Sequence, residues 1–98
     1  QQWNNVGNAG FSAGVAYYTN IAIDNNNVPY VVYRDYGNSY KATVMKYNGT
    51  AWETVGSAGF SVGGAYHTSI AIDNNNVPYV VYEDWGNSHK ATVMKYNG

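Results

Sequence analysis

The chain has no cysteine and no leucine, and only 11% of its 98 residues are charged. Without cysteine, neither a disulfide framework nor a thiolate metal site can form. A net charge of −1 and a single arginine, Arg34, exclude the basic surface that binds nucleic acid or anionic membranes. No apolar run approaches the roughly 18 residues that would span a bilayer as a helix. The sequence therefore predicts neither a nucleic-acid partner nor a membrane partner.

Strand-forming and turn-forming residues dominate what is present. The chain has 11 Tyr and 3 Trp beside many Val, Ile and Thr, residue types that favour β-strands over helices. Its 14 asparagines and 11 glycines supply the turn residues that many short strands require. Segments such as residues 30–33 are apolar or amphipathic without strict alternation, which is typical of a sheet covered on both faces. The composition predicts an all-β protein.

A repeat of 49 residues organises the whole chain. Shifting the sequence by 49 positions aligns Trp3 with Trp52, Asp24 with Asp73 and Gly49 with Gly98, and 37 of the 49 aligned pairs are identical. Four-stranded propeller blades have periods of about 40 to 50 residues. We therefore expect residues 1–98 to form a single two-blade β-propeller unit, with residues 1–49 and 50–98 as its repeats.

Turn residues mark the expected strands. Asp24 and three asparagines end one strand, Pro29 stands at the start of the next, and Asn48-Gly49 is a strong hairpin signal. The expected strands are residues 21–23, 28–33, 42–47 and 50–55, and in the second repeat residues 70–72, 77–82 and 91–96. Residues 3–6 align with the fourth, outermost strand of a blade.

This strand order predicts association between copies. The first segment of the chain resembles the outermost strand of a blade, and the last strand resembles the third strand of a blade. Two blades cannot close a ring, so we expect the first segment of one chain to pair with the last strand of another. Left unpaired, both sheet edges would invite uncontrolled association. Propellers have roughly four to eight blades, so we expect a cyclic homo-oligomer, with a tetramer favoured and a trimer next. The residues expected to exchange strands are Trp3, Asn4, Asn5, Val6, Met94, Lys95 and Tyr96.

Residues 69–73, 78–82 and 90–98 read SIAID, PYVVY and KATVMKYNG. These segments resemble the repeats of large bacterial secreted or surface β-propeller proteins, which implies an extracellular or cell-surface location if the chain is a fragment of such a protein. The two-blade plan is similar, in organisation alone, to small fucose-binding lectins that build six-bladed rings from three chains. Repeats this alike fit a recent duplication, a natural fragment or an engineered symmetric protein.

Candidate metal and catalytic chemistry is sparse. The turns that begin at Asp24 and Asp73 have some likeness to calcium loops, but an apolar residue and a proline follow at once, which favours a hairpin turn. No nucleophile–base spacing stands out among the acidic residues, His67 and His89. The sequence predicts no catalytic residue, no cofactor, no metal and no enzyme activity.

Differences between the two repeats suggest a binding face. Most of them lie in or beside two connections that a propeller places on one face, where loops on a rigid scaffold usually carry binding groups. The candidate ligand-binding residues are Tyr18, His67, Arg34, Glu83, Tyr36, Trp85, Tyr40 and His89. The alternative is loop variation without function, with Arg34 and Glu83 paired between blades. We thus expect a self-assembling scaffold, and as an alternative a lectin-like module that binds carbohydrate or peptide.

Overall fold

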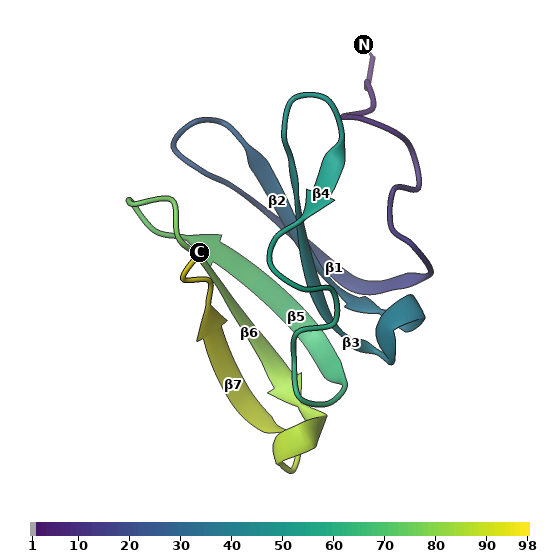
Figure 1. Ribbon diagram of the computed structural model, residues 1–98, viewed down its shortest axis with the longest axis vertical. Coiled ribbons are helices and arrows are strands. Elements are labelled where there is room, and N and C mark those ends of the chain that lie inside the picture. The colour runs from purple at the N-terminus through teal and green to yellow at the C-terminus, as the bar shows by residue number, and fades with distance from the viewer. Residues whose placement is uncertain (1) are drawn as a thin grey trace.

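Two antiparallel sheets make up the protein, which confirms the predicted all-β class (Figure 1). The computed structural model describes residues 2–98. The first sheet has the order β1 (Ala16–Ile23), β2 (Pro29–Asp35), β3 (Lys41–Tyr47) and β4 (Trp52–Thr54), and the second has the order β5 (Ala65–Ile72), β6 (Pro78–Asp84) and β7 (Lys90–Lys95). Short 3-10 turns, η1 (Tyr36–Asn38) and η2 (Trp85–Asn87), follow β2 and β6. Residues 2–98 contain no helix long and apolar enough to cross a membrane.

The two repeats fold in the same way, strand by strand. Ala16 pairs with Asp35 in the first sheet, and Ala65 pairs with Asp84 in the second, so the register is conserved under the shift of 49. The first strand of each sheet has a register shift, between Tyr17 and Asn20 and again at the equivalent place in β5. An extra residue of this kind is a β-bulge, which bends the strand and changes the direction of its side chains.

The bulge explains where the predicted strand bounds are wrong. We expected the innermost strands at residues 21–23 and 70–72, but they begin at Ala16 and Ala65. Tyr18 has a left-handed backbone, with φ of 54°, so apolar periodicity is lost there although backbone pairing continues on both sides. The fourth strand is shorter than predicted because Asn48 Oδ1 accepts hydrogen bonds from the amides of Thr50 and Ala51, at 2.8 and 2.9 Å, which belong to the turn.

Residues 3–6, expected as an outermost strand, have no strand structure in the single chain, and Trp3 is 91% exposed. A strand requires a hydrogen-bonded neighbour, and within residues 2–98 no strand pairs with this segment. The edge of β7 opposite β6 is likewise unpaired in the part of the chain that the structure describes.

The Asp24 and Asp73 segments are hairpin turns. Asp24 Oδ1 accepts hydrogen bonds from the amides of Asn26 and Val28, at 2.8 and 2.9 Å. The amide of Val77 and that of Asn75 hold the pKa of Asp73 below its ordinary value. These carboxylates are therefore committed to their own turns, and residues 2–98 contain no cluster of three metal-ligating side chains.

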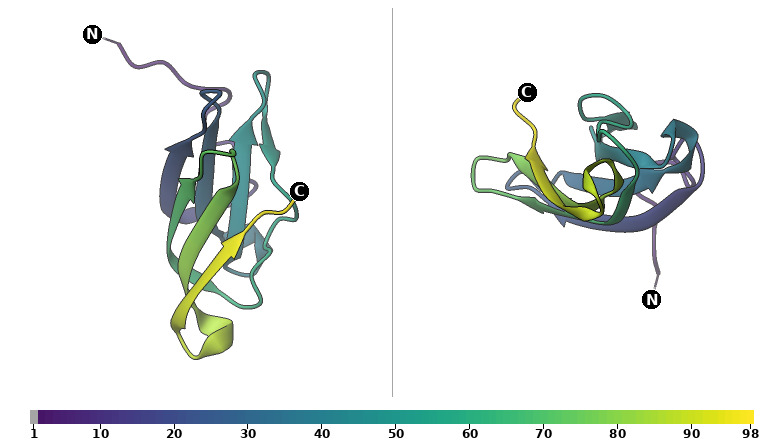
Figure 2. Two further views of the ribbon diagram at one scale, coloured as in Figure 1. Left: turned by 90° about the vertical axis from the view of Figure 1, so that its left-hand side faces the viewer. Right: turned by 90° about the horizontal axis from the view of Figure 1, so that it is seen from below.

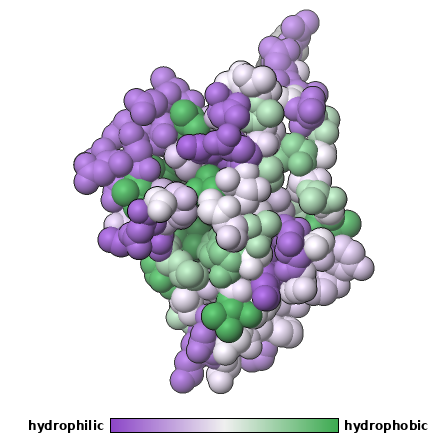
Figure 3. Space-filling model, viewed as in Figure 1, coloured by the Kyte–Doolittle hydropathy of each residue, from purple (hydrophilic) through white to green (hydrophobic). Residues whose placement is uncertain are grey.

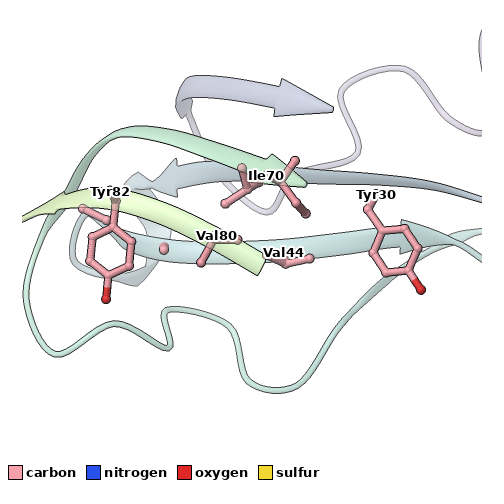
Figure 4. Packing of buried hydrophobic residues seen from close by; sticks show 8 residues of the cluster. Tyr30, Val44, Ile70, Val80 and Tyr82 are labelled. Carbon is pink, nitrogen blue, oxygen red and sulfur yellow. The ribbon is translucent and has the colours of Figure 1, made fainter. Parts of the chain in front are cut away.

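The core lies between the two sheets (Figures 2 and 4). Side chains that alternate along a strand share one face, so Tyr30 and Val32 lie on the same face of β2, and both belong to one buried cluster with Val80 and Tyr82 of β6. Strands β1 and β5 lie side by side at the junction. The buried apolar cluster consists of Tyr30, Val32, Ala42, Val44, Ala65, Ile70, Val80 and Tyr82.

Candidate functional site

The two connections expected to share one face do meet there. The amide of Tyr36, in η1, donates to the carbonyl of Val15 at 3.1 Å, and the amide of Trp85, in η2, donates to the carbonyl of Gly64 at 3.0 Å. The two repeats are joined at the same end, where the amide of Ala65 donates to the carbonyl of Tyr40 at 2.9 Å. The turns at Asp24 and Asp73 lie at the opposite ends of the strands.

Arg34, in β2, lies in a cage of tyrosine rings. Its guanidinium carbon is 4.1 Å from the ring centroid of Tyr66 in β5 and 4.3 Å from that of Tyr17 in β1. The ring centroids of Tyr40 and Tyr18 follow at 4.8 and 5.3 Å. A cation within about 6 Å of a ring centroid is attracted by the electron-rich face of the ring, so four attractions act on one charge. Because Tyr66 belongs to the second sheet, the cage spans the junction between the repeats.

Arg34 has no acidic partner within the described part of the chain. Its side chain is buried, with 7% of the residue exposed, and its Nε has no hydrogen-bond partner. No ion pair joins it to a carboxylate within residues 2–98, so the alternative of an Arg34–Glu83 pair is wrong for the single chain. Glu83 has the same place in β6 that Arg34 has in β2. Glu83 instead lies 3.6 Å from Nδ1 of His89.

A second group of aromatic rings adjoins the cage. Trp85 stacks on Tyr66, with ring centroids 4.2 Å apart and an interplanar angle of 11°, and it meets His89 edge-on at 4.4 Å. The same Tyr66 ring therefore contacts both Arg34 and Trp85. Stacking of this kind favours a defined orientation of the two ring planes relative to each other.

The structure thus brings most of the predicted site residues together. Tyr18, Tyr40 and Arg34 lie in the cage, whereas Trp85, His89 and Glu83 form the adjoining group. The two remaining candidates lie at the margin, where Tyr36 contacts Tyr40 edge-on at 5.2 Å and His67 lies 4.3 Å from Tyr18.

Two rings that the sequence analysis missed, Tyr17 and Tyr66, are central to the site. They are identical in the two repeats, so a comparison of differing positions could not select them. Their position in the sequence could have indicated them, because each directly precedes a candidate residue, Tyr18 or His67, in the same connection. A residue that is identical in the two repeats can still belong to a site, because its neighbouring residues differ between the repeats.

Several of the site residues have strained backbones. Tyr18 and His67 have φ of 54°, and Tyr40 and His89 have φ of 63°. For residues other than glycine, the left-handed region costs about 1–3 kcal/mol and is concentrated at ligand sites and clamps. Burial raises the pKa of Tyr40, the Tyr36 and Tyr17 phenols raise it further, and Arg34 lowers it. The Tyr40 phenol stays neutral at physiological pH and can donate or accept a hydrogen bond.

Two buried aspartates support the loops that carry these strained residues. Asp84 Oδ2 accepts from the Thr92 hydroxyl at 2.7 Å and from the Asn87 amide at 2.8 Å, and these hydrogen bonds hold the pKa of Asp84 below its ordinary value. In the first repeat, Asp35 Oδ2 makes the same two bonds, with the Thr43 hydroxyl and the Asn38 amide. Asp35 and Asp84 are positioning residues that fix η1 and η2.

Comparisons with protein-family models, with curated proteins and with solved structures find no match for this chain.

Proposed function

We propose that the protein is a self-assembling, non-catalytic scaffold, a β-propeller ring to which each chain contributes two blades. In this proposal each sheet is one blade, and copies associate head to tail through a junction like the one inside the chain. Such contacts are heterologous, which means that they join two different surfaces. They give a closed ring when the rotation from one copy to the next adds up to a full turn.

The observation that carries the proposal concerns the two sheet faces that are buried against each other inside the chain. The equivalent residues of the other repeat lie, in each case, on an exposed face. Val32 of β2 and its cross-strand neighbour Val44 are buried against the second sheet, with 0% and 4% exposed. Their equivalents in the second repeat, Val81 and Val93, are also cross-strand neighbours, but they are 39% and 64% exposed. The outer face of the second sheet therefore repeats the face that the first sheet buries.

The opposite half is repeated on the first sheet. Ile70 of β5 is buried in the junction, with 7% exposed, whereas its equivalent Ile21 is 59% exposed. Ile23, on the same face of β1, is 61% exposed. Exposed apolar patches of this kind mark interaction surfaces. Because the exposed valines and the exposed isoleucine are the equivalents of buried junction residues, a second copy of this chain is the occupant that fits both faces.

Native mass spectrometry tests the proposal. Four chains of 10.7 kDa give about 43 kDa, which is the expected species, and three chains give about 32 kDa. The smaller ring would keep the proposal and change the number of chains. A stable monomer at micromolar concentration would contradict it, because the exposed junction faces would then be shown not to associate.

A second candidate is a lectin-like function of the face that carries Arg34, and one observation favours it. A buried guanidinium without a carboxylate is costly unless a ligand supplies the negative charge. Planar carboxylates accept two parallel hydrogen bonds from arginine, and tyrosine rings provide apolar platforms for the faces of a sugar ring. The chemistry of the cage therefore suits a sugar that carries a carboxylate.

Titration calorimetry of the assembled protein with glucuronate, and with glucose as the uncharged counterpart, tests this second candidate. Glucuronate should bind at least about tenfold more tightly than glucose, and Arg34→Met should remove that preference, because a charge-assisted hydrogen-bond pair contributes about 1.5–3 kcal/mol. Asn26→Ala, on the turn at the opposite end of the strands, is the matched control and should leave binding unchanged. Absence of glucuronate binding at millimolar concentration would contradict the lectin-like candidate and leave the scaffold proposal intact.

A further inference from the structure

Trp52, in β4, is anchored by contacts that tie the outer strand of the first sheet to the segment before β1. Its indole stacks on the ring of Phe11, with centroids 4.2 Å apart and an interplanar angle of 9°. Its Nε1 donates to the carbonyl of Val6 at 2.8 Å, and Tyr47 lies beside it at 5.6 Å. Gly7, with φ of 73°, lies underneath, where a Cβ atom would come within 2.9 Å of the indole nitrogen. Only a glycine leaves room for the indole here.

The second repeat contains the same socket. The positions equivalent to the four partners of Trp52 are Val55, Gly56, Phe60 and Tyr96. All four line a cavity of about 270 Å³ between the sheets, together with Val44, Val80 and Met94. Gly56 has the same φ of 73°, and a Cβ atom there would meet the Tyr96 ring at 3.1 Å, as a Cβ atom at Gly7 would meet Tyr47. Figure 3 views this side of the molecule and shows apolar surface gathered near its middle, with hydrophilic residues around it.

Trp3 is the equivalent of Trp52, and its 91% exposure is unusual for so large an apolar side chain. Trp3 does not line the socket of its own chain, and Val6, three residues further on, is held at the first repeat by its hydrogen bond with Trp52. Figure 2 shows the N-terminal segment and the C-terminal end on opposite sides of the molecule.

We infer that the socket of Val55, Gly56, Phe60 and Tyr96 receives Trp3 of a second copy. This inference rests on the proposed head-to-tail assembly and identifies its anchor. The incoming indole stacks on Phe60, and its Nε1 donates to the carbonyl of Val55. The backbone then follows the register observed between β3 and β4, which aligns Trp3 with Tyr96, Asn4 with Lys95 and Asn5 with Met94.

The environment of Trp3 provides the first test. In protein labelled with 5-fluorotryptophan, the fluorine resonance of Trp3 is assigned by loss of its signal in Trp3→Phe. In the assembled protein this resonance should show the small solvent isotope shift of a covered ring, close to that of Trp52. If the protein assembles and the Trp3 resonance keeps the isotope shift of an exposed ring, the socket is refuted while the scaffold stands. If the protein is a monomer, the proposed function itself fails.

Variants provide the second test, measured as the concentration at which the assembly dissociates. Trp3→Ala should weaken association about a hundredfold or more, because buried tryptophans are the strongest anchors of interfaces. The isolated chain should keep its circular dichroism, since Trp3 makes no packed contact within it. Gly56→Ala should weaken association because its methyl group would meet the indole. Gly10→Ala, also at a positive φ of 62° but with no atom within 4 Å of its Cβ position, is the control for backbone strain and should not weaken association. Equal effects of Gly10→Ala and Gly56→Ala would overturn the inference.

Discussion

Deletion of residues 1–5 should abolish the ring and leave monomers or irregular aggregates. The deletion removes the segment that we expect to pair with β7 of another copy, together with Trp3, and it keeps Val6, whose carbonyl holds Trp52. The equivalent pairing of β4 with β3 joins three residue pairs. Each backbone hydrogen bond contributes about 0.5–1.5 kcal/mol net, so the loss should exceed a hundredfold in association at each junction.

Deletion of residues 1 and 2 is the matched control for this truncation. These residues precede the segment that aligns with β4, so the shorter truncation should assemble like the intact chain. Native mass and the temperature of unfolding are measured for both proteins. If the protein without residues 1–5 kept the mass and the thermal stability of the intact chain, strand exchange between copies would be ruled out.

The sequence predicted those parts of the fold that local chemistry determines. The turns at Asp24, Asp73 and Asn48 were placed correctly because short polar side chains bond to the amides of their own turns. The start of β1 and β5 was missed because a bulge with a left-handed tyrosine or histidine carries no composition signal. Such a backbone is fixed by pairing on both sides, which is a property of the sheet and not of the residue.

The candidate site was predictable in place and only partly in composition. Differences between the repeats identified Arg34, Tyr40 and Trp85 because those loops share one face. The role of Tyr66 could not be predicted, since it depends on the contact of β5 with the first sheet, where the ring covers the guanidinium. Equivalent positions in the two repeats can thus contact different neighbours, and only the packing of the two sheets shows which contacts each one makes.

Aspartate substitutions at two equivalent valines should have opposite consequences, and this pair most directly separates folding from assembly. Val32→Asp places a carboxylate at a position with 0% exposure, opposite Val44 and facing the second sheet. A buried, unpaired charge costs several kcal/mol, which is comparable with the whole stability of a small domain. Val32→Asp should therefore prevent the chain from folding, as measured by circular dichroism and by the urea midpoint of unfolding.

Val81→Asp places the same charge on the exposed equivalent face, where water can solvate it in the single chain. The sheets should fold with an unfolding free energy within about 0.5 kcal/mol of that of the unassembled parent chain, as for most surface substitutions. Association should fall at least about a hundredfold, because the head-to-tail junction would bury the carboxylate against an apolar face without a partner. Native mass spectrometry across a dilution series measures this loss. A Val81→Asp protein that assembled at the concentration of the parent would show that this face lies outside the junction, even if a ring forms by another route.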